Sequence, residues 1–492
     1  MQTTTDITAS TNAPGPGRLT FSFATEFAGA RFGDRRLTKR AVRFLDGALV
    51  RPESSLPKMA GGESGAEGVY RLIANDKVTA SKLADPHEAQ TLGRCQAVGA
   101  VLVLHDTTTF GYGKDTKRQG MGIIAGGGMG FLAHVSLCVS EASRQPLGVL
   151  KHQAWARTPA PTQPAKGKPG HKRRAQTAEN NESHRWLKQA KETGKMLGAV
   201  PHVHVADRES DDYKYLAALD DAGEAFVTRV SGNRSLGNGV DLFAKMDGMV
   251  VELCREVRLS RRGAEPGPAQ RKAHPPRAER MARLEISAGR QEIRRATHAP
   301  RTAPKSLQLN YVLVREIDMP EGAEPVIWRL VTNLPVDTPE QIARVVDIYR
   351  SRWVIEEFFK ALKTGCAFNN HQLESFEALS KLLALLLPLA WRLLELRSVA
   401  RADPDAPAKV VLTAQQVAFL RVLHDRQHPK SPMAAKPTVK DVVYAVARLG
   451  GHFKQNGDPG WQTLGAGLQM LLQAEDHAMA LIAAMPHLQG KR

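Results

Sequence analysis

Four side chains able to contact phosphates are spaced for one face of a helix. They stand at offsets of 3, 7 and 14 within YRSRWVIEEFFKALK, as Tyr349, Arg352, Glu356 and Lys363. At about 100° of rotation per residue, a continuous helix would hold all four within an arc of roughly 60°. Apolar side chains occupy the adjoining side of this helix, so the polar stripe would border a buried face. A carboxylate beside a phenol, a guanidinium and an ammonium suggests chemistry on a nucleic-acid backbone.

Two aspartates follow apolar segments that are typical of strands. Asp106 ends VLVLHD, and Asp207 ends HVHVAD. The ends of strands in an α/β sheet commonly carry active-site residues, although for a lone aspartate a turn or helix cap is the favoured interpretation. With Glu356 they make three acids that would repel one another unless a cation neutralised them. Oxygen ligands favour Mg²⁺ or Mn²⁺, and two such ions could activate water or a sugar hydroxyl for in-line phosphoryl transfer.

Other site chemistry has weaker support. His202 and His204 alternate on one predicted strand without a third nitrogen or sulfur ligand at metal-site spacing, so we interpret them as ordinary strand histidines. Neither a nucleophile elbow nor a dinucleotide-binding loop is visible. The four cysteines are isolated and predict no disulfide framework or zinc ribbon, which favours a reducing compartment. They are Cys95, Cys138, Cys254 and Cys366.

The composition indicates a globular protein with a polyanionic partner. A chain of 492 residues predicts two to four domains. Its net charge of +18, from 68 Lys and Arg against 50 Asp and Glu, favours DNA, RNA or an acidic membrane surface. The longest apolar run, residues 382–391, contains Pro388 and is far shorter than the ~20 residues of a membrane span. The N-terminus lacks the pattern of a signal peptide, so we expect a cytoplasmic protein with no membrane partner.

Near the N-terminus a helix is predicted from Arg35 towards Leu49, with Asp34 as its cap. A helical region then continues to about residue 85. One face of the first helix carries four cations, Arg36, Lys39, Arg40 and Arg43. Such a stripe is often just a solvated face, but the excess of one sign favours contact with phosphates.

The centre of the chain alternates strands with helices, which predicts an α/β core. Short apolar runs separated by turns lie between residues 97 and 230, and a helix is predicted at about 183–197. Loops at 111–130 and 158–181 are expected to be mobile connections or nucleic-acid contacts. Residues 231–325 carry many arginines with strand-like alternation, which predicts a β-rich insertion, with a disordered basic loop as the alternative. Two helices are predicted at 439–451 and 461–485.

Several segments resemble one family along nearly the whole chain. They are FGDRRLTKRAVRF, EGVYRLIANDKV, VVDIYRSRWVIEEFFKALKTG and YAVARLGG, together with DTT after the first predicted strand and DRESD after the later one. These are similar to the DDE transposases of the insertion-sequence-four family, which includes the Tn-five transposase. The resemblance implies a ribonuclease-H-like α/β catalytic core with a β-rich insertion between the second aspartate and the glutamate. The expected layout is a disordered tail at 1–18, a helical DNA-binding domain at 19–85, the catalytic domain at 86–400 with its insertion at about 231–325, and a helical dimerisation domain at 401–492.

The resemblance also implies cut-and-paste chemistry on double-stranded DNA in a bacterial cell. Such enzymes nick the transposon end to free a 3′-hydroxyl, form and resolve a hairpin, and join the end to target DNA. Two subunits would pair two DNA ends as a homodimer. A catalytically silent DNA-binding regulator and a stand-alone nuclease of the same fold stay open as alternatives.

Residue roles follow from the same resemblance. Two Mg²⁺ ions per site, for which Mn²⁺ can substitute, would be held by Asp106, Asp207 and Glu356. The phosphates of the DNA end would be held by Tyr349, Arg352 and Lys363. Trp328 matches a family tryptophan that stacks on a flipped base, and Arg229 matches a DNA-contacting arginine. A core position is the ordinary alternative for a single strand tryptophan.

Overall fold

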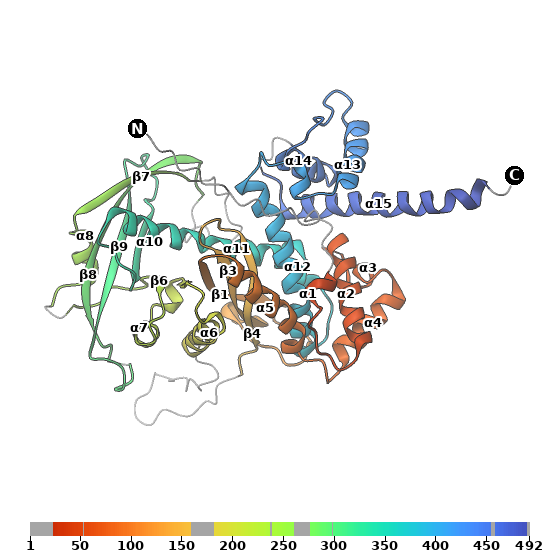
Figure 1. Ribbon diagram of the computed structural model, residues 1–492. Coiled ribbons are helices and arrows are strands. Elements are labelled where there is room, and N and C mark those ends of the chain that lie inside the picture. The colour runs from red at the N-terminus through yellow and green to blue at the C-terminus, as the bar shows by residue number, and fades with distance from the viewer. Residues whose placement is uncertain are drawn as a thin grey trace, which may run out of the picture. The chain divides into compact units, whose positions relative to one another are not determined.

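The computed structural model describes residues 23–52, 54–158, 182–236, 239–259, 276–297, 299–453 and 458–489. It divides into two compact units (Figure 1). A sheet unit contains residues 91–116 and 121–356, and a helical unit contains the remainder of the described chain. The tail predicted at 1–18 and nearly all of the loop predicted at 158–181 lie outside the described residues.

The sheet unit is built on a ten-stranded sheet with the order β2-β3-β1-β5-β6-β10-β9-β8-β7, and β4 pairs with β3. Its strands are β1 (Val101–Gly111), β2 (Gly122–Ile123), β3 (Met129–Ser140), β4 (Pro146–Trp155), β5 (His202–Ala206), β6 (Phe226–Arg229), β7 (Val251–Leu259), β8 (Arg280–Arg294), β9 (Ser306–Ile317) and β10 (Ile327–Thr332). β1, β3 and β4 pair antiparallel, whereas β5 and β6 continue parallel to β1. This mixed core is consistent with a ribonuclease-H-like fold.

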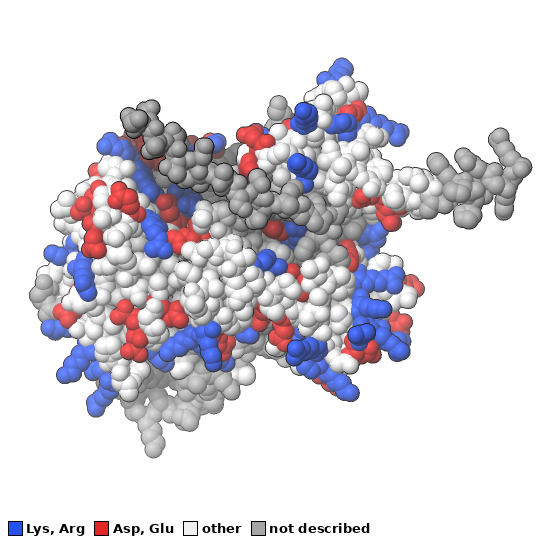
Figure 2. Space-filling view, in the orientation of Figure 1, with Lys and Arg blue, Asp and Glu red and all other residues white. Residues whose placement is uncertain are grey.

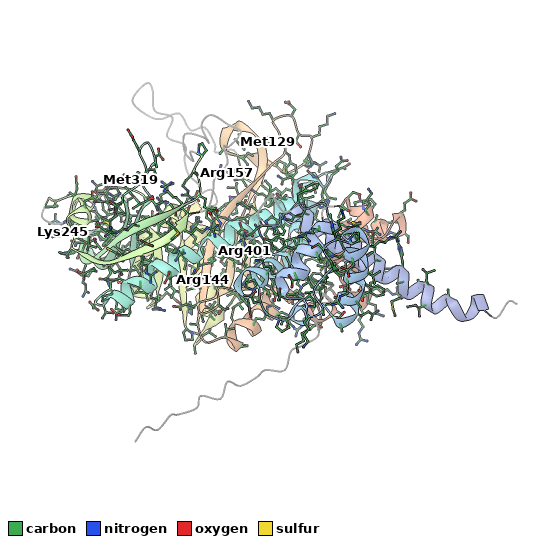
Figure 3. The ribbon with its side chains drawn as sticks, turned by 90° about the horizontal axis from the view of Figure 1, so that it is seen from above. Met129, Arg144, Arg157, Lys245, Met319 and Arg401 are labelled. Carbon is green, nitrogen blue, oxygen red and sulfur yellow. The ribbon has the colours of Figure 1, made fainter. Side chains whose placement is uncertain are left out.

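The strand segments predicted between residues 97 and 230 are all confirmed. Apolar and β-branched side chains account for this, because nearly every position of β1 up to His105 and of β3 is buried. Met129 at the start of β3 and Arg144 in the turn to β4 mark opposite ends of this hairpin (Figure 3). One detail of the prediction is wrong. Asp106 does not end its strand, because β1 stays paired with β3 as far as Gly111↔Gly130.

Different helices cover the two faces of this sheet. They are α6 (Glu182–Leu197), α7 (Tyr213–Asp221), α8 (Leu242–Asp247) and α10 (Pro339–Ser351), followed by α11 (Trp353–Lys360), which leads out of the unit. On one face, α6 packs its Gln189 against Ser136 and its Trp186 against His134. α7 and α8 join α6 in the same apolar core. The other face carries the candidate site, and Tyr349 of α10 packs against it.

The predicted insertion continues the same sheet. β8 pairs with β9 over twelve positions, from Arg283↔Ile317 to Arg294↔Ser306, and β9 pairs with β10. The strand predicted from the alternation in RMARLEISAGRQEIR is therefore confirmed as β8. Arg280 donates to both carboxylate oxygens of Glu316 at 2.9 and 3.0 Å, a charged pair across β8 and β9.

The helical unit combines the two ends of the described chain. Its helices are α1 (Phe23–Glu26), α2 (Arg35–Val50), α3 (Leu56–Met59), α4 (Glu63–Ala74), α5 (Ala80–Ala97), α12 (Phe376–Ala402), α13 (Ala414–Gln427), α14 (Val439–Leu449) and α15 (Trp461–Gln489). Lys381 of α12 donates to the carbonyl oxygen of Ile73 at 3.0 Å, and the rings of His87 and Trp391 lie 5.3 Å apart. The N-terminal and C-terminal helical segments thus share one unit.

Boundaries near the N-terminus follow local capping and packing. The Asp34 carboxylate accepts a hydrogen bond from the Arg36 backbone at 2.8 Å, which confirms the predicted cap of α2. The predicted domain boundary at residue 85 falls inside α5, and the two units divide further on in that helix, after Gln90. Across the described part of the chain, no helix has the length and apolarity needed to cross a membrane.

Candidate active site

The register of the parallel strands places Asp106 and Asp207 side by side. β1 and β5 pair in parallel from Val101↔His202 to Leu104↔Val205. Each aspartate lies two residues beyond that last pair, at the point where β5 has ended and β1 continues. Since neighbouring strands run about 4.8 Å apart, the two carboxylates start from adjacent backbone positions on one face. Asp106 and Asp207 were expected to meet because each ends a strand. They meet instead because of the register in which β1 and β5 pair.

Both aspartates also bond to the local backbone. Asp106 Oδ1 accepts from the Thr107 backbone at 2.8 Å. Asp207 caps the 3₁₀ turn Arg208–Ser210, and its Oδ1 accepts from the Glu209 backbone at 2.8 Å. Asp207 can therefore cap this turn and also belong to the acid group.

Arg352 connects the glutamate to this aspartate pair. Its Nη1 lies 3.3 Å from Asp106 Oδ2, while its Nη2 donates to Glu356 Oε1. The side chains of Arg352, Asp106 and Glu356 are 15%, 16% and 29% exposed, so the group is partly withdrawn from solvent but still accessible. Residues 246 or more positions apart in sequence therefore meet at one guanidinium.

The carboxylates interact electrostatically. Burial, followed by repulsion from Asp207, raises the pKa of Asp106 to about 7. Arg352 and the Thr107 backbone oppose this shift, and Glu356 adds a smaller repulsion. Asp106 thus lacks enough positive charge around it to ionise fully at neutral pH, which is the situation that a bound cation would relieve.

Three further predicted residues lie on the same face. Sheet register carries Arg229 on β6 and Trp328 on β10 to the face of the two aspartates. The Trp328 and Tyr349 rings meet edge to face with centroids 5.5 Å apart, and Arg229 donates to the Ile327 carbonyl oxygen at 3.2 Å. Burial raises the pKa of the Tyr349 phenol, on which Arg352, Arg229 and Asp207 also act. The structure therefore brings seven predicted site residues together.

The predicted continuous helix is wrong. α10 ends at Ser351, and the Arg352 and Ile355 backbones then donate to the carbonyl oxygens of Tyr349 and Arg352, three residues back, at 3.0 and 3.1 Å. The Ser351 hydroxyl also donates to the Asp347 carbonyl oxygen at 3.0 Å, a contact that bends helices.

After α11 the chain forms a π-helical turn, Ala361–Gly365. Tight and wide turns change the rotation per residue, so the 60° arc calculated for a regular helix does not apply. Lys363 lies in this π-helical turn, within the helical unit.

The predicted basic stripe lies on α2. Arg36, Lys39 and Arg43 are exposed, while Arg40 is half-buried. Space for Arg40 comes from Gly68 of α4, where a Cβ would lie 3.1 Å from its Nε. None of the four cations forms an ion pair with another described residue. Figure 2 shows Lys and Arg side chains, with acidic ones between them, over α2 to α4.

Two family models match the chain. A transposase DNA-binding model matches residues 22–78, and a transposase DDE domain model matches residues 169–391. The chain carries the domains of a DDE transposase. The α2 stripe lies in the DNA-binding match, and Asp207, Trp328 and Glu356 lie in the DDE match, whereas Asp106 precedes it.

The acid group suits the divalent metal ions that DDE domains use. Asp106, Asp207 and Glu356 offer only carboxylate oxygens, the donors preferred by Mg²⁺ and Mn²⁺. The guanidinium of Arg352 supplies positive charge between two of them, and the raised pKa of Asp106 indicates that more is needed. In donor type and in charge, the three residues fit a divalent metal.

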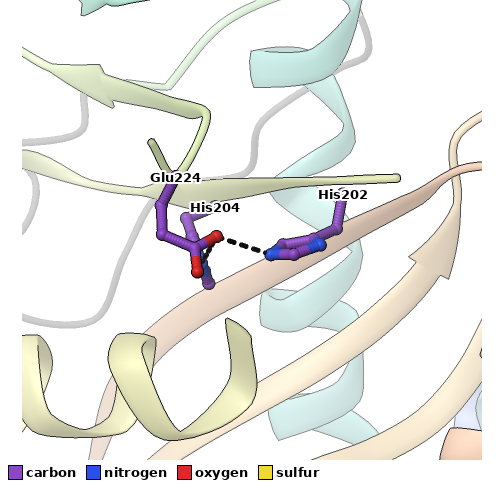
Figure 4. A group of neighbouring side chains, drawn as sticks. All are labelled: His202, His204 and Glu224. Atoms are coloured by element: carbon purple, nitrogen blue, oxygen red, sulfur yellow. Dashed lines mark hydrogen bonds and ion pairs between the residues drawn. The ribbon is translucent and has the colours of Figure 1, made fainter. Parts of the chain in front are cut away.

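The structure also contains a second group of possible metal ligands, which the sequence did not predict. His202 and His204 of β5 meet Glu224, which precedes β6, and their ligand atoms all lie within 4.8 Å of one another (Figure 4). We expected ordinary strand histidines because no third nitrogen or sulfur ligand for a metal stands near them in the sequence. The missing partner is a carboxylate 20 positions after His204, and an H-x-H strand followed by a Glu before the next strand is the signal that could have found it.

Proposed function

We propose that this chain is a cut-and-paste transposase of the insertion-sequence-four family. It would bind the double-stranded ends of its transposon as a homodimer in a bacterial cytoplasm. It would cleave each end through a hairpin and join the 3′ ends to target DNA. The observation that carries the proposal is the common register of Asp106 and Asp207 beside Arg352, which contacts both Asp106 and Glu356.

The acid group would be the catalytic centre. Asp106, Asp207 and Glu356 would hold two Mg²⁺ ions, for which Mn²⁺ can substitute. When bound, these ions supply an activated water or 3′-hydroxyl and stabilise the leaving oxygen. Bound metal would replace Arg352 as the positive partner of Asp106 and Glu356. The guanidinium of Arg352 would then be free to bind a DNA phosphate through two hydrogen bonds.

Neighbouring residues would position the DNA end. Tyr349 would donate its phenol hydrogen to a phosphate, and Lys363 would add a compact charge. Arg229 is suited to a nearby phosphate, since it shares a face of the sheet with the aspartates. Tyr349 and Arg229, which lie in the sheet unit with the acids, would hold the scissile bond beside them.

Cleavage of DNA flanking the gene tests this function. The flanking DNA is searched for short inverted repeats, and duplexes that carry them are incubated with the protein and Mg²⁺, with and without a target plasmid. We expect end cleavage, a hairpin product and joined 3′ ends. Cleavage without joining would indicate a stand-alone nuclease, and binding without cleavage would indicate a silent regulator.

The salt dependence of DNA binding should report the basic surface. If roughly six to ten phosphates are neutralised, affinity for end DNA should fall by roughly 10³ to 10⁵ between 50 and 200 mM salt. Changing Lys39 and Arg43 of α2 to Gln should reduce the slope of log affinity against log salt by about two. Lys58 and Lys82 changed to Gln are a matched pair outside the stripe. A flat salt response, or equal slopes for both pairs, would remove α2 from the DNA-binding surface.

Trp328→Ala should impair hairpin formation more than nicking. Stacking of an aromatic ring on a base contributes about 1–3 kcal/mol, so we expect a loss of about 5- to 150-fold in the hairpin step. Gel analysis of nicked, hairpin and fully cleaved products separates the steps. Trp328→Phe should restore much of the rate, because it keeps an aromatic face near Tyr349. If Trp328→Ala formed the hairpin with unchanged yield, the role of Trp328 would be packing within the protein and not base stacking.

A homodimer is supported by α15. Four large apolar side chains on this helix are exposed by 45–61%: Met470, Met479, Leu481 and Ile482. Their spacing distributes these side chains around α15 instead of along one stripe, and together they offer apolar area for a protein contact. We propose that this helix contacts a second subunit in the DNA-bound complex.

A further inference from the structure

A cluster of histidines lies on the sheet face opposite the acids. Residues alternate between faces along a strand, so His105 points away from the side of Asp106, and His202 and His204 share its face. The rings of His105 and His204 lie 5.1 Å apart, and those of His202 and His204 lie 5.2 Å apart. The proposed transposition chemistry gives this cluster no role.

Glu224 completes a set of three ligand atoms. Its Oε2 lies 2.7 Å from His202 Nε2 and 3.5 Å from His204 Nε2 (Figure 4). Ligands bonded at about 2.1 Å to a tetrahedral zinc ion stand about 3.4 Å from one another, a value between these two distances. The existing separations therefore need only small adjustments to hold a metal.

His204 has a nitrogen that the described residues do not satisfy. Its Nε2 is fully buried without a well-formed hydrogen bond in the described structure, although it faces Glu224. An imidazole that carries its proton on Nδ1 has a lone pair on Nε2 with which it can bind a metal. At 3.5 Å from Glu224 Oε2 this nitrogen has a weak partner at most, and a bond to a metal would satisfy it.

The other nitrogens of both rings are held as in metal sites. His202 Nδ1 donates to the Val200 carbonyl oxygen at 2.7 Å, which fixes the ring with its Nε2 facing Glu224 Oε2. His204 Nδ1 lies 2.9 Å from His105 Nε2, and His105 Nδ1 lies 2.9 Å from the Ser136 hydroxyl. Metal-bound histidines usually have such partners on the second nitrogen, because these fix the ring and its tautomer.

A glycine provides room for the carboxylate. Gly194 lies within α6, where a Cβ would stand 2.3 Å from Glu224 Oε1. Any other side chain at this position would displace the carboxylate from the histidines. The helix surface is thus shaped around this glutamate.

We propose that His202, His204 and Glu224 bind a zinc ion. Two imidazole nitrogens and one carboxylate oxygen form a donor set suited to zinc, with water as the fourth ligand. Glu224 is 21% exposed, which leaves solvent access. The ion would join β5 to the segment before β6, and these two strands lead to Asp207 and Arg229. Its role would be to stabilise the beginnings of these two central strands from the face opposite the acids.

Zinc titration of the full-length chain tests the site. Protein without an affinity tag is stripped with a chelator and titrated with Zn²⁺ against a chromophoric competitor, and its thermal unfolding is followed with and without the ion. We expect one site that resists excess Mg²⁺ and raises the melting temperature. Glu224→Gln should weaken binding more than 100-fold, beyond the 10- to 100-fold typical of outer-shell changes, and Gly194→Ala should weaken it by about 10- to 100-fold.

Matched variants separate this site from other ligands. Glu192→Gln on α6, Asp207→Asn in the acid group and Cys254→Ser at the exposed thiol should keep zinc binding unchanged. If Glu224→Gln does not fold, X-ray absorption of the zinc-loaded wild type decides, with two imidazoles and no sulfur around the ion as the expected result. The proposal would be overturned by sulfur ligands, by a wild type without zinc affinity, or by equal affinity in folded Glu224→Gln.

Discussion

Glu356→Gln is expected to lower metal-dependent cleavage of end DNA by at least about 10³-fold, while affinity for that DNA stays within a few-fold of wild type. Glutamine keeps the size of the side chain and its ability to accept a hydrogen bond from Arg352, but it loses the negative charge that would hold metal. Cleavage rates under single-turnover conditions and a gel-shift titration measure the two quantities separately. The expected pattern is a lost chemical step with preserved binding.

A matched control is Glu340→Gln, an exposed carboxylate in the first turn of α10. Its cleavage rate should equal that of wild type. Arg352→Gln provides a second comparison, because it removes the guanidinium without removing a proposed metal ligand. Substantial Mg²⁺-dependent nicking by Glu356→Gln would exclude this glutamate from the catalytic centre.

Asp106→Asn should abolish cleavage and also stabilise the metal-free protein at high pH. The folded-state pKa of Asp106, about 7, lies above the ordinary value of 3.8. A raised pKa means that the carboxyl contributes its full stability below about pH 4, and that this contribution is lost as pH rises through about 7. Three pKa units correspond to about 4 kcal/mol, which is an upper value because the site is partly solvated. The asparagine variant avoids this loss.

Chemical unfolding at pH 4, 6 and 8, with and without Mg²⁺, measures the effect. The two proteins should differ little at pH 4, and the variant should be more stable at pH 8 without metal. Mg²⁺ should stabilise the wild type at pH 8 and leave Asp106→Asn unchanged, since ligand binding stabilises the state that binds it. Asp241→Asn, at an exposed position, should follow the wild type. A variant less stable than wild type at pH 8 would contradict the electrostatic account.

Much of the core could be predicted because local and long-range preferences agree there. The apolar runs around β1, β3 and β5 are buried as strands, and Asp34 caps its helix as its residue type suggests. The proximity of Asp106 and Asp207 could be anticipated from two strands with an acid after each. Their alignment depends on the pairing of Leu104 with Val205, a register that no local pattern specifies.

The departures have tertiary causes. The helix is interrupted at Arg352, which contacts Asp106 from a distant strand. Such a contact cannot be predicted from helical periodicity. Glu224 reaches the histidines only because β5 and β6 pair in parallel and Gly194 leaves space. The helical region predicted to end at about residue 85 continues in α5 to Ala97, and the helix contains Pro86.

The continuous pairing from β7 to β10 has a consequence for shortened versions of this chain. Deleting the segment that forms β7, β8 and β9 would remove β9, the strand that pairs with β10. The backbone amides and carbonyls of β10 beside Trp328 would then have no hydrogen-bond partners on that side. Bare strand edges recruit other chains, so a minimised protein would be prone to aggregate even with every proposed ligand intact. A miniaturised enzyme would need a replacement edge, such as a strand bearing lysines, before its chemistry could be assessed.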